Sequence, residues 1–390
     1  MSKVKRTFGT GSFNKKGEKF KTTEQVSQVL NILKENGIDE LDTARLYGEG
    51  TSEELLGETS EFQAFTVSTK ANPMISKLTK ENITKQCDES LKAMKRSSVD
   101  IFYIHALKEN GIDELDTARL YGEGTSEELL GETSEFQAFT VSTKANPMIS
   151  KLTKENITKQ CDESLKAMKR SSVDIFYIHA PDRETPFEET AQAINDLYQR
   201  GSFKRFGLSN FTAEEVQQMY DICKEKNYVL PSVYQGNYNP ITRKNEQELF
   251  PLLRKLGICF YAYSPIAGGF LVKTPDQIKN TQANTRFDTS TWVGQYYAGL
   301  YCNETFFSAL EVFQDRCKKL NIKPSEACYS WLLNHSLLKE GDAIILGASN
   351  LEQFHENLRD SRGVALNADI IQALEDLWKM VEKEAPKYHF

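Results

Sequence analysis

The chain contains one stretch of sequence twice in direct succession. Residues 33–106 (the first copy) and residues 107–180 (the second copy) are identical at every position. Each copy is longer than the ~20–50 residue units that build solenoids, and solenoid repeats also diverge from one another. The identity therefore indicates a recent duplication or an error in assembling the gene. Without one copy the chain would have the length of a complete (β/α)8 barrel.

The composition is that of a globular protein that acts on a small molecule. The chain is 39% hydrophobic and 26% charged with a net charge of -7, so no basic surplus points to nucleic acid. No apolar run reaches the ~20 residues that span a bilayer, and the start lacks the apolar centre of a signal peptide. The seven cysteines show no metal-ligand spacing and predict reduced thiols without a metal site. We expect a cytoplasmic protein without membrane or nucleic-acid partners, and the oligomeric state, a homodimer included, stays open.

Short apolar strands alternate with amphipathic helices, a pattern typical of parallel βαβ units. With only the second copy counted, strands are expected at residues 6–13, 114–118, 139–143, 174–179, 204–209, 232–235, 259–263 and 343–346. Helix starts are expected at three capping boxes. These are Thr125 with Glu128, Thr185 with Glu188 and Thr212 with Glu215, with Pro186 as the first helical residue of the second. The eight units predict an α/β protein, a (β/α)8 TIM barrel with a surplus copy of its second to fourth strands.

Either copy can supply those strands to the single barrel domain expected over residues 1–390. We expect the second copy to do so, because residues 107–390 then carry seven strand–helix units without interruption and residues 33–106 form an excursion. If the first copy were used, the excursion would leave after His105, on the rim where barrel enzymes hold their active sites. Earlier synthesis of the first copy favours that alternative. The surplus strands have unpaired edges, which predicts lower solubility.

Three successive strands of the second copy end in ionisable residues. Asp116 and Tyr121 lie in LDTARLYG, Lys144 in VSTKAN and His179 in YIHAP. The equivalents in the first copy are Asp42, Tyr47, Lys70 and His105. Each residue alone also fits a structural role, such as a helix cap or a solvated strand end. Together at one rim they predict a proton-transfer site, because a lysine cation lowers the pKa of a neighbouring phenol.

The order Asp, Tyr, Lys, His in these settings resembles the catalytic tetrad of the aldo-keto reductase family, and the resemblance covers essentially the whole chain. APDRETPFEET and LPSVYQGNYN are most similar to the aflatoxin-aldehyde reductase branch. The resemblance implies that Tyr121 protonates a carbonyl oxygen and that Lys144 and Asp116 tune this phenol. It also implies that His179 orients the substrate while NADPH delivers hydride.

The same resemblance implies where NADPH binds, since the chain lacks the GxGxxG fingerprint of a doubly wound fold. The matching residues are Ser209, Asn210 and Gln235 for the carboxamide, Tyr263 for ring stacking, Ser264, Ile266, Gly268 and Gly269 for the pyrophosphate, Arg286 for a phosphate, and Ser349, Gln353 and Asn357 for the adenine side. Glycines let backbone N–H groups approach phosphate closely. An ordinary tight turn also explains the glycine pair, and a solvated side chain also explains Arg286.

The resemblance implies a neutral aldehyde as substrate. Members of the branch that reduce succinic semialdehyde hold its carboxylate with two arginines, whose positions fall near Gly299 and at Phe390 here. Tyr296 matches a substrate-side tyrosine of the branch, but it cannot neutralise a carboxylate. Two alternatives stay open. One is an NADPH-binding regulatory subunit that resembles potassium-channel β-subunits, and the other is an inactive product of the duplication.

Overall fold

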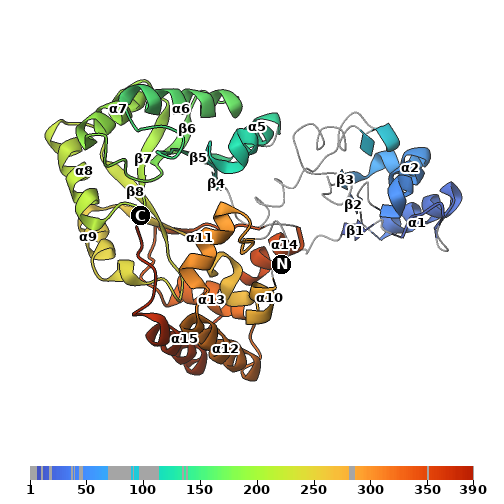
Figure 1. The fold of residues 1–390 in the computed structure, drawn as a ribbon. Helices are drawn as coiled ribbons and strands as arrows, with labels where there is room; N and C mark the ends of the chain where they lie inside the picture. Colours follow the sequence, from blue (N-terminus) through green and yellow to red (C-terminus); the bar gives the residue numbers. More distant parts are fainter. Residues whose placement is uncertain are drawn as a thin grey trace. The chain divides into compact units, whose positions relative to one another are not determined.

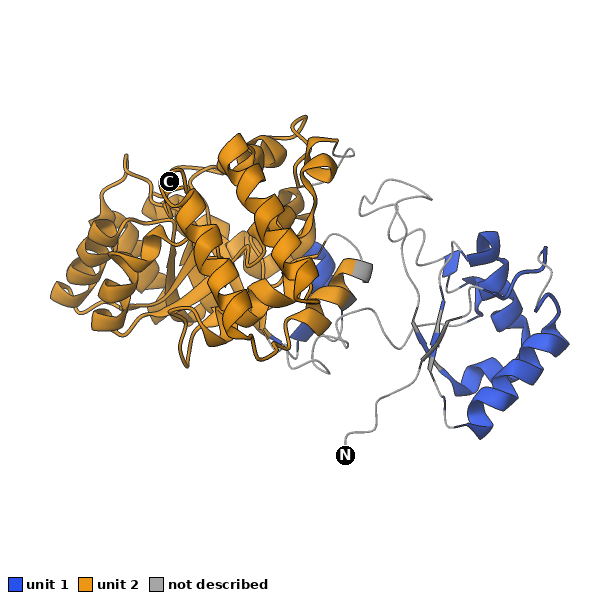
Figure 2. Cartoon of the chain, turned by 90° about the horizontal axis from the view of Figure 1, so that it is seen from below, with its two compact units in different colours: residues 1–113, 128–139 blue, residues 114–127, 140–390 orange. Residues whose placement is uncertain are grey.

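Parallel strands form two separate sheets in the computed structural model. The structure describes residues 7–9, 12–16, 20–36, 38, 40–43, 47–68, 89–90, 92–95, 114–133, 136–137, 139–280, 286–348 and 351–389. Each sheet belongs to one of two units (Figure 2). Unit 1 comprises residues 1–113 and 128–139, and unit 2 comprises residues 114–127 and 140–390.

Unit 2 contains a curled sheet of seven parallel strands within the described residues, in the order β10-β9-β8-β7-β6-β5-β4. Its strands are β4 (Glu114–Asp116), β5 (Thr140–Ala145), β6 (Val173–Ile178), β7 (Phe203–Ser209), β8 (Pro231–Asn237), β9 (Cys259–Tyr263) and β10 (Ala343–Ile344). All seven lie where the sequence predicts strands. The sheet is a half-barrel consistent with the (β/α)8 fold, and β4, β5 and β6 come from the second copy.

Helices follow the strands of unit 2 in the expected alternation. They are α6 (Lys154–Ala167), α7 (Phe187–Gln199), α8 (Ala213–Glu225), α9 (Leu249–Leu256), α10 (Pro275–Lys279), α11 (Trp292–Tyr301), α12 (Glu304–Lys319), α13 (Pro324–Asn334), α14 (Leu351–Asp360) and α15 (Ala368–Val381). The shorter 3-10 helices are η3 (Tyr121–Gly124), η5 (Lys244–Glu246) and η6 (Ala267–Val272), and α5 (Thr125–Glu132) follows η3. Helices α6 to α9 pack in succession along the outer side of the sheet (Figure 1). In the described part of the chain, no helix has both the length and the apolar character needed to cross a bilayer.

The expected first barrel strand pairs elsewhere. It is β1 (Thr7–Gly9), and it lies in the three-stranded parallel sheet of unit 1 with β2 (Glu40–Asp42) and β3 (Thr66–Ser68). The expectation that it joins the second-copy strands is therefore wrong for the described residues. Strands β2 and β4 have the same sequence, so β1 can pair equally well with either. The shorter loop to β2 favours that partner by about 1 kcal/mol of closure entropy.

Unit 1 has a hydrophobic core of its own. Helices α1 (Thr23–Glu35) and α2 (Thr51–Glu58) accompany the three strands, with 3-10 helices η1 (Tyr47–Gly50) and η2 (Ser60–Ala64). Leu30 of α1, Leu55 of α2, Leu41 of β2 and Val67 of β3 are all buried in one cluster. The apolar side chains of this cluster therefore pack against one another within unit 1 and not against the seven-stranded sheet of unit 2.

The predicted capping boxes have different outcomes. Thr212 and Glu215 form the predicted capping box at the start of α8. The predicted box at Thr185 is wrong, because Pro186 takes the N-cap position and the Thr185 hydroxyl instead donates to a carboxylate three residues earlier. The Thr125 hydroxyl likewise donates to a carbonyl oxygen three residues earlier, since η3 runs directly into α5.

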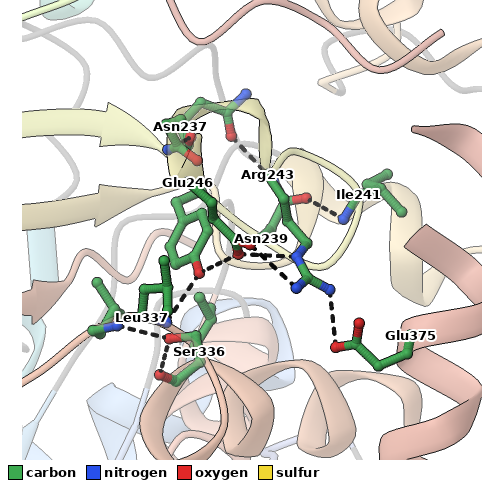
Figure 3. Close-up of polar contacts among 12 residues, drawn as sticks. Asn237, Asn239, Ile241, Arg243, Glu246, Ser336, Leu337 and Glu375 are labelled. Carbon is green, nitrogen blue, oxygen red and sulfur yellow. Dashed lines mark hydrogen bonds and ion pairs between the residues drawn. The ribbon is translucent and has the colours of Figure 1, made fainter. Parts of the chain in front are cut away.

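A polar network fixes the loop that follows β8 (Figure 3). Arg243 donates from Nε to Glu246 and from Nη1 to Glu375 of α15, both at 2.9 Å. Its guanidinium carbon lies 4.9 Å from the ring centroid of Trp331 on α13. Nδ2 of Asn239 donates a hydrogen bond to the side-chain oxygen Oδ1 of Asn237 at 3.0 Å. These contacts tie the loop that follows β8 to α13 and α15.

Candidate active site

The carboxyl ends of β4 and β5 hold a buried ion pair. Lys144 is fully buried, and its Nζ lies 2.7 Å from each carboxylate oxygen of Asp116 and 2.8 Å from the Thr117 carbonyl oxygen. Oδ1 of Asp116 also accepts hydrogen bonds from Ser142 Oγ at 2.6 Å and from Gln235 Nε2 at 2.9 Å. Because donors surround the carboxylate, the ammonium group is held in one position.

Tyr121 and His179 flank this pair. The Lys144 ammonium lies 5.3 Å from the centroid of the Tyr121 ring. The His179 ring, just after β6, lies 6.0 Å from the Tyr121 ring and nearly perpendicular to it. Tyr121 remains 38% exposed. The structure thus brings together the four residues that the sequence places at three strand ends, with the cation beside a tyrosine that is partly exposed.

Burial and neighbouring charges both act on the ionisable groups of the cluster. Burial raises the pKa of Tyr121 above its usual value, and the opposing effect of the Lys144 cation does not outweigh it. The lysine acts in the predicted direction, and burial sets the net direction of the shift. Burial works to lower the pKa of Lys144, but Asp116 and Tyr121 outweigh it and raise that pKa. The lysine is charged and the tyrosine protonated at neutral pH.

His179 is neutral. Burial, together with the nearby Lys144 cation, lowers its pKa to about 3. Nδ1 of its ring lies 2.8 Å from Nδ2 of Asn146, the residue that follows β5. The imidazole therefore carries a single proton at neutral pH and can donate one hydrogen bond from it.

Side chains expected to bind the cofactor continue the cluster along the ends of β7, β8 and β9. Asn210, next to the buried Ser209, donates from Nδ2 to the His179 carbonyl oxygen at 2.8 Å. Its Oδ1 accepts a hydrogen bond from the Tyr263 hydroxyl at 3.1 Å. Gln235 joins through its bond to the tetrad carboxylate. Asn210 and Gln235 therefore contact the tetrad directly, and Ser209 and Tyr263 are linked to it through Asn210.

Tyr297 of α11 gathers a second group of the expected residues. Its hydroxyl lies 2.8 Å from Ser264 Oγ, and its ring centroid lies 5.1 Å from the guanidinium carbon of the exposed Arg286. Gly268 has a φ of 66°, and a Cβ there would lie 2.3 Å from the Tyr297 ring. Tyr296, the expected substrate contact, is the preceding residue of the same helix, and its ring packs against that of Tyr297 at 5.4 Å.

The turn that begins η6 has an open backbone. The Gly269 N–H donates to the Ile266 carbonyl oxygen at 3.0 Å, and Gly269 has a φ of 99°. A Cβ at Gly269 would meet only the end of Lys273, at 4.0 Å. The Tyr297 ring thus leaves no room for a side chain at Gly268, whereas the space beside Gly269 is open.

The remaining predicted residues are not brought into this cluster by any described contact. Gln353 is exposed on α14, and Asn357 of the same helix donates to the Gly347 carbonyl oxygen at 2.9 Å. Ser349 lies outside the described residues. In the first copy, Asp42 ends β2 and Tyr47 begins η1. Lys70 and His105 also lie outside the described residues.

Three residues of the cluster were missed by the sequence analysis. Ser142 shares a strand face with Lys144, and the two-residue period of a β-strand is a signal that pairs them. Asn146 follows the same strand directly. Tyr297 carries no signal beyond its neighbour Tyr296. Within the described ranges, no group of three or more His, Cys, Asp and Glu side chains is arranged to hold a metal ion.

Comparison with known proteins assigns the chain to a family. The sequence model described as the Aldo/keto reductase family matches residues 7–110 and residues 106–379. The chain belongs to the aldo/keto reductase family. Family membership supports an oxidoreductase activity, and the family typically uses a nicotinamide cofactor.

Relatives of this aldo/keto reductase carry the names of reductases or of an oxidoreductase. Oxidoreductase sirO of Leptosphaeria maculans is 40% identical over 290 residues, which cover 73% of this chain and 87% of the relative. Aflatoxin B1 aldehyde reductase member 2 of Rattus norvegicus is 39% identical over 299 residues, covering 73% and 81%. Aldo-keto reductase pigE of Monascus ruber is 32% identical over 310 residues, covering 75% and 89%. The similarity to an aflatoxin aldehyde reductase agrees with the branch that the sequence motifs resemble.

Proposed function

We propose that this aldo/keto reductase reduces aldehydes to alcohols with NADPH and that Tyr121 is its general acid. The observation that carries the proposal is the buried Lys144–Asp116 pair directly behind a phenol that is 38% exposed. The raised pKa keeps the phenol protonated at neutral pH. A protonated hydroxyl beside a fixed cation is suited to giving its proton to a carbonyl oxygen.

Each member of the tetrad has a separate task in this mechanism. As Tyr121 gives up its proton, the Lys144 cation stabilises the phenolate that forms. Asp116 keeps that cation within reach. The neutral His179 donates a hydrogen bond to the same carbonyl oxygen and so orients the substrate. NADPH, when bound, supplies the hydride that reduces the carbonyl carbon.

The residues along β7, β8 and β9 fit a nicotinamide dinucleotide. Gln235 uses its amide N–H on Asp116, which leaves its Oε1 to accept from a carboxamide. Ser209 and Asn210 add a hydroxyl and an amide at the same rim, and Tyr263 adds an aromatic face. These groups would hold the nicotinamide end of the cofactor against the tetrad.

The η6 turn fits the phosphate end of the same cofactor. Gly269 lies in the left-handed region with open space where a Cβ would stand, which leaves room for a phosphate group beside this turn. The exposed Arg286 guanidinium can pair with a phosphate. Ser264, Ile266 and Gly268 would shape this turn. Ser349, Gln353 and Asn357 would hold the adenine side.

A neutral aldehyde is the proposed substrate class. Tyr296 would contact it from α11. The same helix carries Gly299 where carboxylate-binding relatives have an arginine, so the site has no cation there to pair with a substrate carboxylate. The second copy supplies the working tetrad in this proposal, and Asp42, Tyr47, Lys70 and His105 are surplus.

Oxidation of NADPH by the purified full chain with an aromatic aldehyde such as nitrobenzaldehyde tests the proposal. The variant that lacks residues 33–106 is the matched comparison. We expect both proteins to be active, because the tetrad lies in residues 107–180. Tight NADPH binding, seen as quenched tryptophan fluorescence, without NADPH oxidation by either protein would contradict the reductase function and favour a regulatory subunit. Activity in the shortened variant alone would mean that the first copy blocks a working site.

A further inference from the structure

Asn146 has only one arrangement of its side-chain amide that satisfies its neighbours. It is 3% exposed, and its Oδ1 accepts the Met148 backbone N–H at 2.8 Å. A backbone N–H can only donate, so this contact requires the amide oxygen and not the amide nitrogen. The nitrogen Nδ2 must therefore face the His179 ring, where it lies 2.8 Å from Nδ1.

The backbone of Asn146 is fixed as well. The buried Gln160 of α6 accepts the Asn146 backbone N–H at 2.8 Å through Oε1 and donates to the Asn146 carbonyl oxygen at 3.2 Å through Nε2. A residue held at both its main chain and its side chain cannot turn to suit a different histidine. Asn146 therefore imposes its hydrogen-bond pattern on its neighbour.

That pattern selects one tautomer of the imidazole. An amide nitrogen can only donate, so Nδ1 of His179 must accept and the single ring proton must lie on Nε2. From this we propose that Asn146 is a positioning residue that holds His179 in the Nε2–H tautomer, with its one donor on the ring nitrogen that does not contact Asn146. The catalytic consequence rests on the proposed reductase function, but the tautomer itself does not.

Nitrogen-15 NMR of protein labelled at histidine tests the proposal in the unaltered chain. The two ring nitrogens give distinct signals when protonated and unprotonated, and a His179→Gln variant identifies the signals that belong to His179. We expect His179 to show a protonated Nε2 and an unprotonated Nδ1 at neutral pH. A protonated Nδ1 would overturn the proposal, whether or not the protein reduces aldehydes.

The Asn146→Asp variant reverses the donor. A carboxylate can still accept the Met148 N–H, but it now accepts from His179 as well, so the proton is expected on Nδ1. In the reductase assay we expect kcat to fall by about 10–100-fold with little change in NADPH affinity, as for other side chains that orient a histidine through its second nitrogen. Unchanged histidine signals in this variant would refute the role of Asn146.

Asn367→Asp is the matched control. It makes the same chemical change at the exposed N-cap of α15, where Asp caps a helix as well as Asn does. We expect it to leave both the His179 signals and kcat unchanged. If wild-type His179 shows the Nε2–H tautomer while the wild-type protein lacks reductase activity, the proposed function fails and the assignment of the tautomer stands.

Discussion

The two copies of the repeated sequence share their local geometry. In the turn after the strand, Gly48 and Gly122 have φ angles of 57° and 58°, and the glutamates that follow them both have 55°. The Thr51 and Thr125 hydroxyls both donate to the carbonyl oxygen of the glycine three residues earlier, at 2.6 Å. Identical local sequence has produced identical turns in two different units. Contacts within a few residues are therefore sufficient to determine this part of the fold.

The long-range contacts of the copies differ. Strand β2 lies between β1 and β3, whereas β4 lies at the end of the seven-stranded sheet beside β5. Asp116, at the end of β4, accepts from Gln235, which is 119 residues away and outside the repeat. One chain has only one Gln235, so only one copy can make this contact. The comparison teaches that a repeated sequence can duplicate a turn but not a site assembled from the rest of the chain.

Replacing the equivalent tyrosines is expected to separate the copies most sharply. Tyr121→Phe removes the proposed general acid, and we expect kcat/KM for aldehyde reduction to fall by about 10²–10⁴-fold. Tyr47→Phe makes the same change in unit 1 and should leave kcat/KM unchanged. Steady-state NADPH oxidation by the two single variants and the double variant measures both effects. Full activity in both single variants would mean that the tyrosine assignment is wrong.

Local sequence patterns predict the strands and turns of this protein, but not the long-range contacts by which the two copies differ. The seven strands of unit 2 could be predicted because apolar runs and turn residues are local signals, and the capping box at Thr212 is local too. The hydrogen bond from Gln235 to Asp116 could not be predicted, since it depends on how strands far apart in the chain come together. The strand sequences do not distinguish the partners of β1 either, because β2 and β4 have the same sequence and only the shorter loop favours β2. The net pKa direction of Tyr121 depends on burial, which the residue order does not report.

Removing the buried cation is expected to weaken one unit only. Lys144→Met leaves the Asp116 carboxylate without its cation, and breaking a buried pair in this way costs about 3–5 kcal/mol of unfolding free energy. We expect urea unfolding to show this loss in the transition of unit 2. Adding Asp116→Asn should recover part of it, because no unpaired charge is then buried. An equal loss in the matched Lys70→Met variant would contradict the expectation that only unit 2 is weakened.

The smallest effect is expected where the first copy meets a residue outside the repeat. Lys15 lies 2.8 Å from Glu58 and 3.5 Å from Glu54 on α2, and all three side chains are 34–42% exposed. Exposed ion pairs contribute about 0–1 kcal/mol and are screened by salt, so Lys15→Ala should lower the unfolding free energy of unit 1 by no more than that.

The control for this variant is Lys16→Ala, whose pair with Glu49 is 72% and 78% exposed and should contribute less still. Urea unfolding at low and high salt measures both variants. A loss above about 2 kcal/mol for Lys15→Ala, retained in high salt, would exceed what exposed pairs supply. The long-range contacts of the first copy would then be as strongly stabilising as those of the second. The small loss that we expect for Lys15→Ala instead means that the two copies differ in whether their long-range partners are buried. They do not differ simply in the number of ion pairs.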